Sequence, residues 1–347
     1  MMNLGISILF RAIPLVMGAV CLAFGLYLLR VDDAGHFVAG HVDIALAGIC
    51  YALFTTAATI IRQLIDRYRT IWRIVLPASG YLVALITVIW GISIAARGHA
   101  PEEDLAGHVL IGVGLISACV STVATASTYF TFISRNAARE PGSEAPDEVY
   151  SATTGRVLIA IPFLCGAIAI ILAIVLWTRG DTASWTAGHV VFGLGLICLS
   201  LVSLVASIVR QVRNGFGEPE RFRWSLVVVV LGTVNILLGL GVLVFASSPA
   251  RIAPGCILIG LGLICYSILS KVLLLALVWR RQEPLANRIP ILPILTALTC
   301  LFFSAFLAEA ADTDSAFFVA ARVMVGLGAV CFTLFSIVSI LEAGTST

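Results

Sequence analysis

Five positions at a nearly constant interval carry the side chains best able to do chemistry. They are His41, His108, His189, Cys256 and Arg322, separated by 67, 81, 67 and 66 residues. Each is followed by recurring glycines, and four of the five copies have a cysteine nine residues on. A repeat at a fixed period indicates that the chain is built from copies of one supersecondary unit.

Histidine is the side chain whose ordinary pKa lies closest to physiological pH. We expect His41, His108 and His189 to lie in the first turn of their helices, on the outward side of a membrane. The helix dipole there disfavours imidazolium, whereas the carboxylates at 32–33 and 102–104 favour it. Two interpretations stay open: an external pH sensor, or interfacial histidines that hydrogen-bond the helix ends.

Arg322 places a permanent positive charge in the same layer and would repel cations at a channel mouth. It needs an acidic partner, for which Glu309 and Asp312 are candidates. Three further polar residues interrupt apolar segments, each in one repeat only, and so are candidates for function. They are Asp43, Asn235 and Lys271. For the lysine we expect a side chain that extends toward the cytoplasmic interface.

Composition excludes a soluble globular protein. Of the 347 residues, 60% are hydrophobic and 12% charged, and the mean hydropathy is +1.07. Soluble domains have about 25% charged residues. The net charge of +2 and a single lysine give no basic patch for nucleic acid. We therefore expect an integral membrane protein whose general partner is the lipid bilayer.

Ten apolar segments are long enough to cross a bilayer, which takes about 20 residues. Their approximate limits are 5–29, 39–61, 74–96, 106–132, 156–178, 187–209, 225–246, 255–279, 289–309 and 320–341. Because Arg11 interrupts the first segment, it is interpreted as a retained helix and not as a cleaved signal peptide.

The segments pair into five helical hairpins, in which the second helix carries the repeated motif. The hairpins cover about 5–61, 74–132, 156–209, 225–279 and 289–341 of a single transmembrane domain, 1–347. A hydrophilic loop at 134–150 separates the second hairpin from the third. Five parallel repeats can close into a pseudo-fivefold ring with the second helices inside, and an open arc is the alternative.

Basic residues orient the hairpins. Sixteen of the twenty-one lie at the N-terminal end or near the connections between hairpins. The positive-inside rule then places the connections, the 134–150 loop and both termini in the cytoplasm.

One face of the second helices suggests a lumen. At about 100° per residue, a row of hydroxyls lies on the same face as the five titratable positions and about 21 Å deeper. These residues are Thr55, Thr122, Ser203, Ser270 and Ser336. Between the two ends, Leu115, Leu196 and Leu263 form a candidate hydrophobic constriction. The alternative is a packed ring without a lumen, in which small residues serve helix contact.

The nine cysteines all lie in apolar stretches, and no C-x-x-C pair occurs. We interpret them as small packing residues. The sequence contains no nucleotide-binding loop, no H-E-x-x-H and no nucleophile with an adjacent base. We therefore expect neither enzyme activity nor a metal or cofactor.

Longer segments carry a resemblance over nearly the whole chain. They are 37–42, 106–109, 264–281, 285–290 and 325–344, and they resemble the YhiM-like bacterial inner-membrane proteins, a family of unknown function linked to acid survival. The resemblance implies location in the bacterial inner membrane and a role in the acid-stress response.

Three functional hypotheses follow. The first is a pH-responsive channel or transporter for protons, ions or a small solute. The second is a non-conducting scaffold or regulatory partner with a packed helical core. The third, a redox or lipid-binding protein, depends only on the cysteines and scattered glycines.

Overall fold

The computed structural model describes residues 4–64, 70–97, 100–129, 151–213, 218–245, 252–278, 291–311 and 316–345. Within these ranges the chain forms ten long α-helices and one short 3-10 helix, with no strand, so the all-α prediction is confirmed there. The helices are α1 (Leu4–Leu28), α2 (Ala34–Leu64), α3 (Thr70–Arg97), α4 (Pro101–Ala126), α6 (Ala152–Arg179), α7 (Thr182–Val212), α8 (Glu218–Val244), α9 (Ile252–Val278), α10 (Ile291–Ala311) and α11 (Ala316–Thr345), with η1 (Ser127–Tyr129) after α4. The predicted loop at 134–150 lies outside the described residues.

The second helix of each hairpin begins three to five residues earlier than its apolar limit indicates. Polar residues just before the predicted apolar segments start these helices. Asp181 caps α7 by accepting a hydrogen bond from Ser184 N at 2.8 Å, and Pro101 occupies the first turn of α4. Both residue types are favoured at helix N-termini because they suit the unpaired N–H groups there.

The two helices of a hairpin differ in burial. Nine described helices contain an apolar span long enough for a membrane, and in α1 the apolar stretch within the searched residues is the shorter Ala12–Leu28. In α2, α4, α7, α9 and α11, 72–83% of the span is buried, against 22–33% in α3, α6, α8 and α10. We call the first set the inner helices, and α1, α3, α6, α8 and α10 the outer helices.

Outer helices expose large aliphatic side chains along their lengths. On α3 these are Leu82, Leu85, Ile86, Ile89 and Ile92, each more than half exposed. Such a surface is unfavourable in water and suits hydrocarbon, where helices satisfy their own backbone hydrogen bonds. The structure is therefore that of a multi-pass membrane protein.

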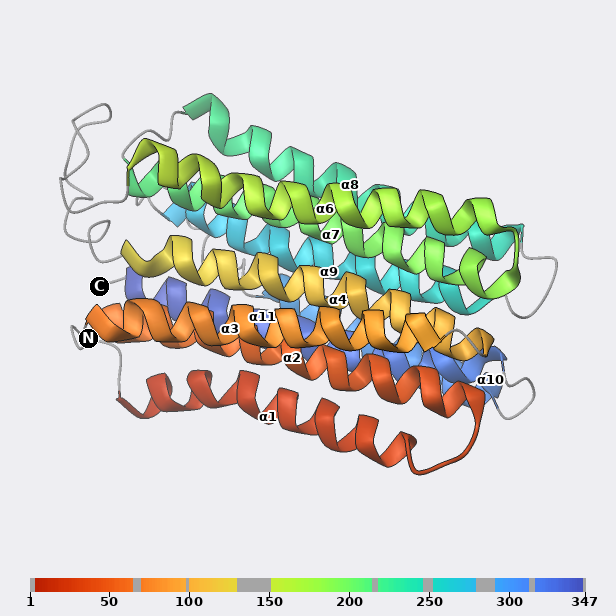
Figure 1. Cartoon of the computed structure of the whole chain (residues 1–347). Coiled ribbons are helices and arrows are strands. Elements are labelled where there is room, and N and C mark those ends of the chain that lie inside the picture. Colours follow the sequence, from red (N-terminus) through yellow and green to blue (C-terminus); the bar gives the residue numbers. More distant parts are fainter. Residues whose placement is uncertain are drawn as a thin grey trace.

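The inner helices contact one another in the order α2, α4, α7, α9 and α11, and α11 in turn contacts α2. Each outer helix packs chiefly against the inner helix of its own hairpin. Figure 1 shows the helices running along one common direction, with the start of α1 and the end of α11 at the same end of the bundle. Which side of the membrane that end faces remains a prediction.

Close backbone approach joins the helices within a hairpin. A β-carbon added to Gly107 would lie 2.5 Å from Ala95 N and 2.8 Å from Gly91 O, both on α3. Two further pairs repeat this arrangement: Gly25 with Gly40, and Gly239 with Gly255. The glycine that precedes the titratable position therefore serves to pack the hairpin, as small residues do between membrane helices.

Replacing Gly107 by alanine should force α3 and α4 apart, because the obstructing atoms are backbone and cannot rotate away. We expect a loss of about 1–3 kcal/mol, the usual range for overpacking. Thermal unfolding of the detergent-solubilised protein measures the loss. The matched control is Gly241→Ala on α8, where an added β-carbon meets nothing within 4 Å. Equal unfolding temperatures for the two variants would contradict this account of hairpin packing.

Candidate functional site

A cavity of about 360 Å³ lies on the axis between the inner helices, and we call it the vestibule. Its rim contains the exposed residues Ala34, Pro101 and Thr182, at the starts of α2, α4 and α7. Its wall takes one aliphatic residue from the same repeat position of each inner helix. These are Val42, Val109, Val190, Ile257 and Val323. The vestibule therefore opens at the end of the bundle where the inner helices begin.

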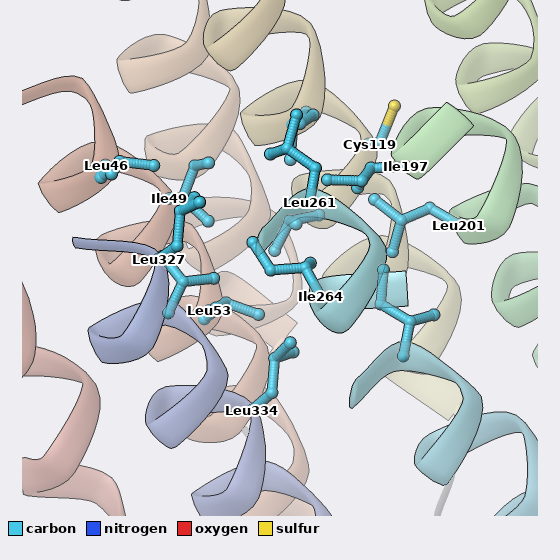
Figure 2. Packing of buried hydrophobic residues seen from close by; sticks show 14 of the residues in the cluster. Leu46, Ile49, Leu53, Cys119, Ile197, Leu201, Leu261, Ile264, Leu327 and Leu334 are labelled. Carbon is cyan, nitrogen blue, oxygen red and sulfur yellow. The ribbon is translucent and has the colours of Figure 1, made fainter. Parts of the chain in front are cut away.

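Four leucines line the floor of the vestibule, and we call them the leucine layer: Leu46, Leu194, Leu261 and Leu327. They also line a second space of about 30 Å³ deeper on the axis, the inner void. Figure 2 shows Leu46, Leu261 and Leu327, from three different helices, extending into the region between their ribbons. The leucine layer therefore separates the vestibule from the inner void.

The inner void is lined almost entirely by aliphatic side chains. One layer consists of Ile49, Ile116, Ile197, Ile264 and Val330, and the next of Leu53, Val120, Leu201, Ile268 and Leu334. A volume of about 30 Å³ could hold roughly two water molecules, but such apolar walls offer them few hydrogen bonds. In this structure the axis is thus closed by hydrocarbon over three layers.

Lys271 on α9 is the charged residue that lines the inner void. Its side chain is 3% exposed, and it lies at the level of Val123 and Leu204, beyond the three aliphatic layers. The expected extension of this lysine to the cytoplasmic interface is therefore not what the structure shows. A buried ammonium on the axis is costly unless an anion or several dipoles accompany it.

The predicted lumen-facing hydroxyls lie elsewhere. All five are fully buried, and neither cavity is lined by them. Thr55 Oγ1 donates to Ala52 O at 2.7 Å and Ser336 Oγ to Thr333 O at 2.7 Å, so these hydroxyls are satisfied by their own helices. Ser270 does the same, Thr122 bonds Ala118 O and Tyr81 Oη, and Ser203 Oγ has no partner within the described residues.

The predicted constriction is displaced in the same way. Neither cavity is lined by Leu115, Leu196 or Leu263. Each residue that lines the axis comes one position after a residue of the predicted lumen-facing side. This corresponds to a rotation of about 100° around the helix. The signal that could have located them was present, because the positions 1, 5, 8 and 12 residues after the titratable one are aliphatic in all five copies.

The small residues predicted for the lumen lie at contacts between inner helices. A β-carbon added to Gly112 would lie 2.6 Å from Leu194 Cδ1 on α7, and one added to Gly260 would lie 2.6 Å from Met324 Sδ on α11. Each glycine thus accommodates a side chain from the next inner helix.

The five titratable positions do not line the vestibule either. His41, His108 and His189 are the eighth residues of their helices, about 10 Å from the first residue, so they do not lie in the predicted first turn. The helices begin before the apolar segments because polar residues form their first turns. Cys256 and Arg322 also lie beyond the first turns of α9 and α11, which begin at Ile252 and Ala316.

The histidine rings are 6–9% exposed and each lies beside the carbonyl four residues earlier, with Nδ1–O distances of 2.7–2.8 Å. His41 packs against Trp90 with ring centroids 5.1 Å apart. His189 packs against Trp177. When His189 Nδ1 carries no proton, it accepts a hydrogen bond from Trp177 Nε1 at 3.0 Å. When it is protonated, it donates to Trp185 O instead. These contacts match the interpretation in which the histidines hydrogen-bond helix backbone.

A polar cluster that the sequence did not reveal joins three helices near the rim. Asp104 of α4 lies 3.2 Å from Arg179 of α6, 3.3 Å from His108 Nδ1, and accepts from Ser184 of α7 at 3.3 Å. His108 is four residues from Asp104, but Arg179 and Ser184 are 75 and 80 residues away, so sequence spacing gave no signal for those two partners.

Two carboxylates at the helix starts have a lowered pKa. Hydrogen bonds from the His36 side chain and backbone lower the pKa of Asp33, and the backbone N–H of Ser184 lowers that of Asp181. In both cases the donor stabilises the ionised form.

The remaining polar residues mark individual helix contacts. Arg322 is half-buried with its guanidinium 4.7 Å from the Phe318 ring, whereas Glu309 is exposed and Asp312 lies outside the described residues. Asn235 of α8 donates to Gly193 O at 3.3 Å.

The nine cysteines are free and buried. Two of them receive hydrogen bonds across equivalent contacts of the inner helices. Ser200 Oγ lies 3.4 Å from Cys265 Sγ, and Thr333 Oγ1 lies 3.7 Å from Cys50 Sγ. These contacts agree with a packing role, since a thiol fills a small space and accepts a weak hydrogen bond.

Comparison with known proteins gives two matches. A family model described as "Protein of unknown function (DUF2776)" matches residues 2–346. Inner membrane protein YhiM of Escherichia coli strain K12 is 51% identical over 348 residues, which cover 99% of each chain. No solved structure matches this chain.

Removing the cap of α7 should destabilise the protein in a pH-dependent way. The folded pKa of Asp181 is lowered, so its contribution is present above the ordinary aspartate range and is lost as pH falls through the folded value. We expect Asp181→Ala to cost about 1 kcal/mol at neutral pH and less in acid. Unfolding midpoints measured across pH test this, with Asp32→Ala as control for removing an exposed charge just before another inner helix. A loss that is the same at every pH would contradict the cap.

Proposed function

We propose that this chain, which belongs to the DUF2776 family of proteins of unknown function, forms a conduit for a small solute across the bacterial inner membrane. The observation that carries the proposal is the alignment of two cavities on one axis. All five inner helices contribute to both cavities, and the leucine layer borders both. A packed bundle needs no such shared axis.

The proposal includes a pseudo-fivefold ring of five parallel hairpins. Equivalent repeat positions line the axis in each inner helix, and the inner helices contact one another in a closed order. Closure is favourable because each hairpin then buries both of its flanks. The outer helices of such a ring would face lipid, which their exposed aliphatic side chains suit.

The gate would be hydrophobic. Water is unstable in a narrow aliphatic passage, so a constriction of leucine and isoleucine blocks ions without any plug. The arrangement described here corresponds to the closed state. Opening requires the inner helices to tilt or rotate until the leucine layer widens enough to be wetted.

Lys271 suggests which solute would pass. Its ammonium would lie at the inner end of the passage and would repel cations while attracting small anions. We therefore propose small monovalent anions as the conducted class. The aliphatic vestibule would hold such an anion weakly, which favours passage over tight binding.

A response to acid would act through helix contacts, because the histidines do not face the axis. One such contact is the cluster on Asp104, which joins His108 to Arg179 and Ser184 of the next hairpin. The resemblance to a family linked to acid survival supports this part of the proposal. Cytoplasmic location of both termini also belongs to it, supported by the positive-inside rule.

A specific observation favours the second candidate, a non-conducting scaffold. Every layer between the vestibule and Lys271 is aliphatic, and the inner void measures only about 30 Å³. In that case the vestibule would be a packing defect or a docking pocket. Flux measurements on the variants below decide between the two functions.

Leu194→Ala should increase flux, because Leu194 belongs to the leucine layer and its truncation widens the narrowest part of the axis. Chloride release from liposomes containing the purified protein, normalised to folded protein, measures the effect at several pH values. The control is Leu196→Ala, two residues along the same helix and off the axis. Both changes should cost about 2–5 kcal/mol in stability. If neither variant nor wild type conducts above empty liposomes, the conduit proposal fails.

Lys271→Gln should lower the ratio of anion to cation flux, since it removes the charge that lines the inner void. Lys271→Arg keeps the charge and should preserve the ratio. Parallel chloride and potassium measurements on the Leu194→Ala background make the ratio measurable. An unchanged ratio in Lys271→Gln would show that this side chain does not select the solute.

A further inference from the structure

The contact that joins the last repeat to the first differs from the other contacts between inner helices. At two of the other contacts an apolar side chain lies against a glycine of the preceding inner helix, Leu258 at Gly193 and Met324 at Gly260. At the α11–α2 contact the equivalent side chain is Asp43, and a β-carbon added to Gly326 would lie 2.6 Å from its Oδ1. A carboxyl group thus occupies the place of an apolar side chain.

Asp43 has no hydrogen bond in the described part of the chain that would offset the cost of its burial. The residue is 0% exposed, and within the described part of the chain neither carboxyl oxygen has a hydrogen-bond partner. An unpaired carboxylate in such a position is very costly, and binding a proton removes most of that cost.

Arg322 is the second departure from the repeat, and it belongs to the same contact. It lies on α11 one turn before Gly326, where the other inner helices carry histidine or cysteine. Its guanidinium is over the Phe318 ring and within electrostatic range of Asp43, with no ion pair between them. The two substitutions therefore place opposite charges on facing helices.

The surroundings of Asp43 contain few other titratable groups. Cys21 faces it from α1 and Arg322 from α11, while His41 on its own helix is turned toward Trp90. The Phe318 ring also contacts the His36 ring, with centroids 4.3 Å apart. His36 in turn bonds the exposed Asp33 at 2.9 Å. Contacts between charged and aromatic groups therefore connect Asp33, just before α2, with Arg322.

We propose that Asp43 and Arg322 form a proton-binding site at the α11–α2 contact. In the arrangement described here Asp43 carries the proton, and Arg322 remains on Phe318. When the O–H bond of Asp43 breaks, the proton leaves to water at the rim, and the carboxylate attracts Arg322 into an ion pair beside Gly326. The net charge of the pair falls from +1 to zero.

The site depends on the geometry of this contact and not on conduction. If the axis conducts, the site would supply its pH response, because acid would break the ion pair at one of the five contacts that surround the leucine layer. Asp43→Leu would restore the residue type found at this position in α4 and α9.

Infrared difference spectroscopy of the purified protein tests the proposal. Acidification should produce the carbonyl band of a buried protonated carboxyl group in the wild type, and Asp43→Asn should lack it. Arg322→Gln should raise the midpoint of that band by at least one pH unit, a tenfold gain in proton affinity, because the carboxylate loses its partner. Glu309→Gln, which alters an exposed carboxyl on α10, should leave the band unchanged.

A variant with an apolar substitute guards against failure to fold. Asp43→Leu should remain monodisperse, and its unfolding temperature should not show the pH step of the wild type. A band that persists in Asp43→Asn or Asp43→Leu would overturn the proposal, as would an unchanged midpoint in Arg322→Gln. None of these measurements involves flux, so their failure would not decide whether the axis conducts.

Discussion

The rest of the structure depends on the close contact between a glycine of one helix and an atom of its neighbour. Within hairpins the contact is backbone to backbone, as at Gly91 and Gly107, and between inner helices it is side chain to glycine, as at Gly260 and Met324. In lipid there is little hydrophobic drive to bring helices together, so dispersion contacts at short distance must do so. These glycines set the rotation of each helix about its own axis.

That rotation explains where the other side chains lie. Once glycine and the small polar residues face neighbouring helices, the positions one residue later must face the common axis. These are valine, leucine and isoleucine in every copy, and they build the vestibule, the leucine layer and the inner void. Hydroxyls such as Thr55 and Ser336, which are buried at helix contacts, bond to their own helix because no water reaches them there.

The residues that depart from the repeat give the bundle its asymmetry. Asp43 and Arg322 lie at one contact between inner helices, Asn235 binds a carbonyl of α7, and Lys271 lies at the inner end of the axis. Polar groups in such positions are costly in a membrane, so they indicate places where the protein binds, selects or responds.

The sequence by itself determined the membrane class and, in the part of the chain that the structure describes, the ten long helices. The hydropathy pattern gives the length of each apolar segment and the period of the repeat, and neither depends on how the helices pack. Only the tertiary structure decided which face of each inner helix looks inward. Both the small polar face and the aliphatic face could line an axis or contact a neighbour, since lipid, protein and a dry lumen are all apolar surroundings. The tertiary structure also decided which groups lie near Asp43 and Asp104, because Arg322 is nearly 280 positions from Asp43, and Arg179 and Ser184 are 75 and 80 positions from Asp104.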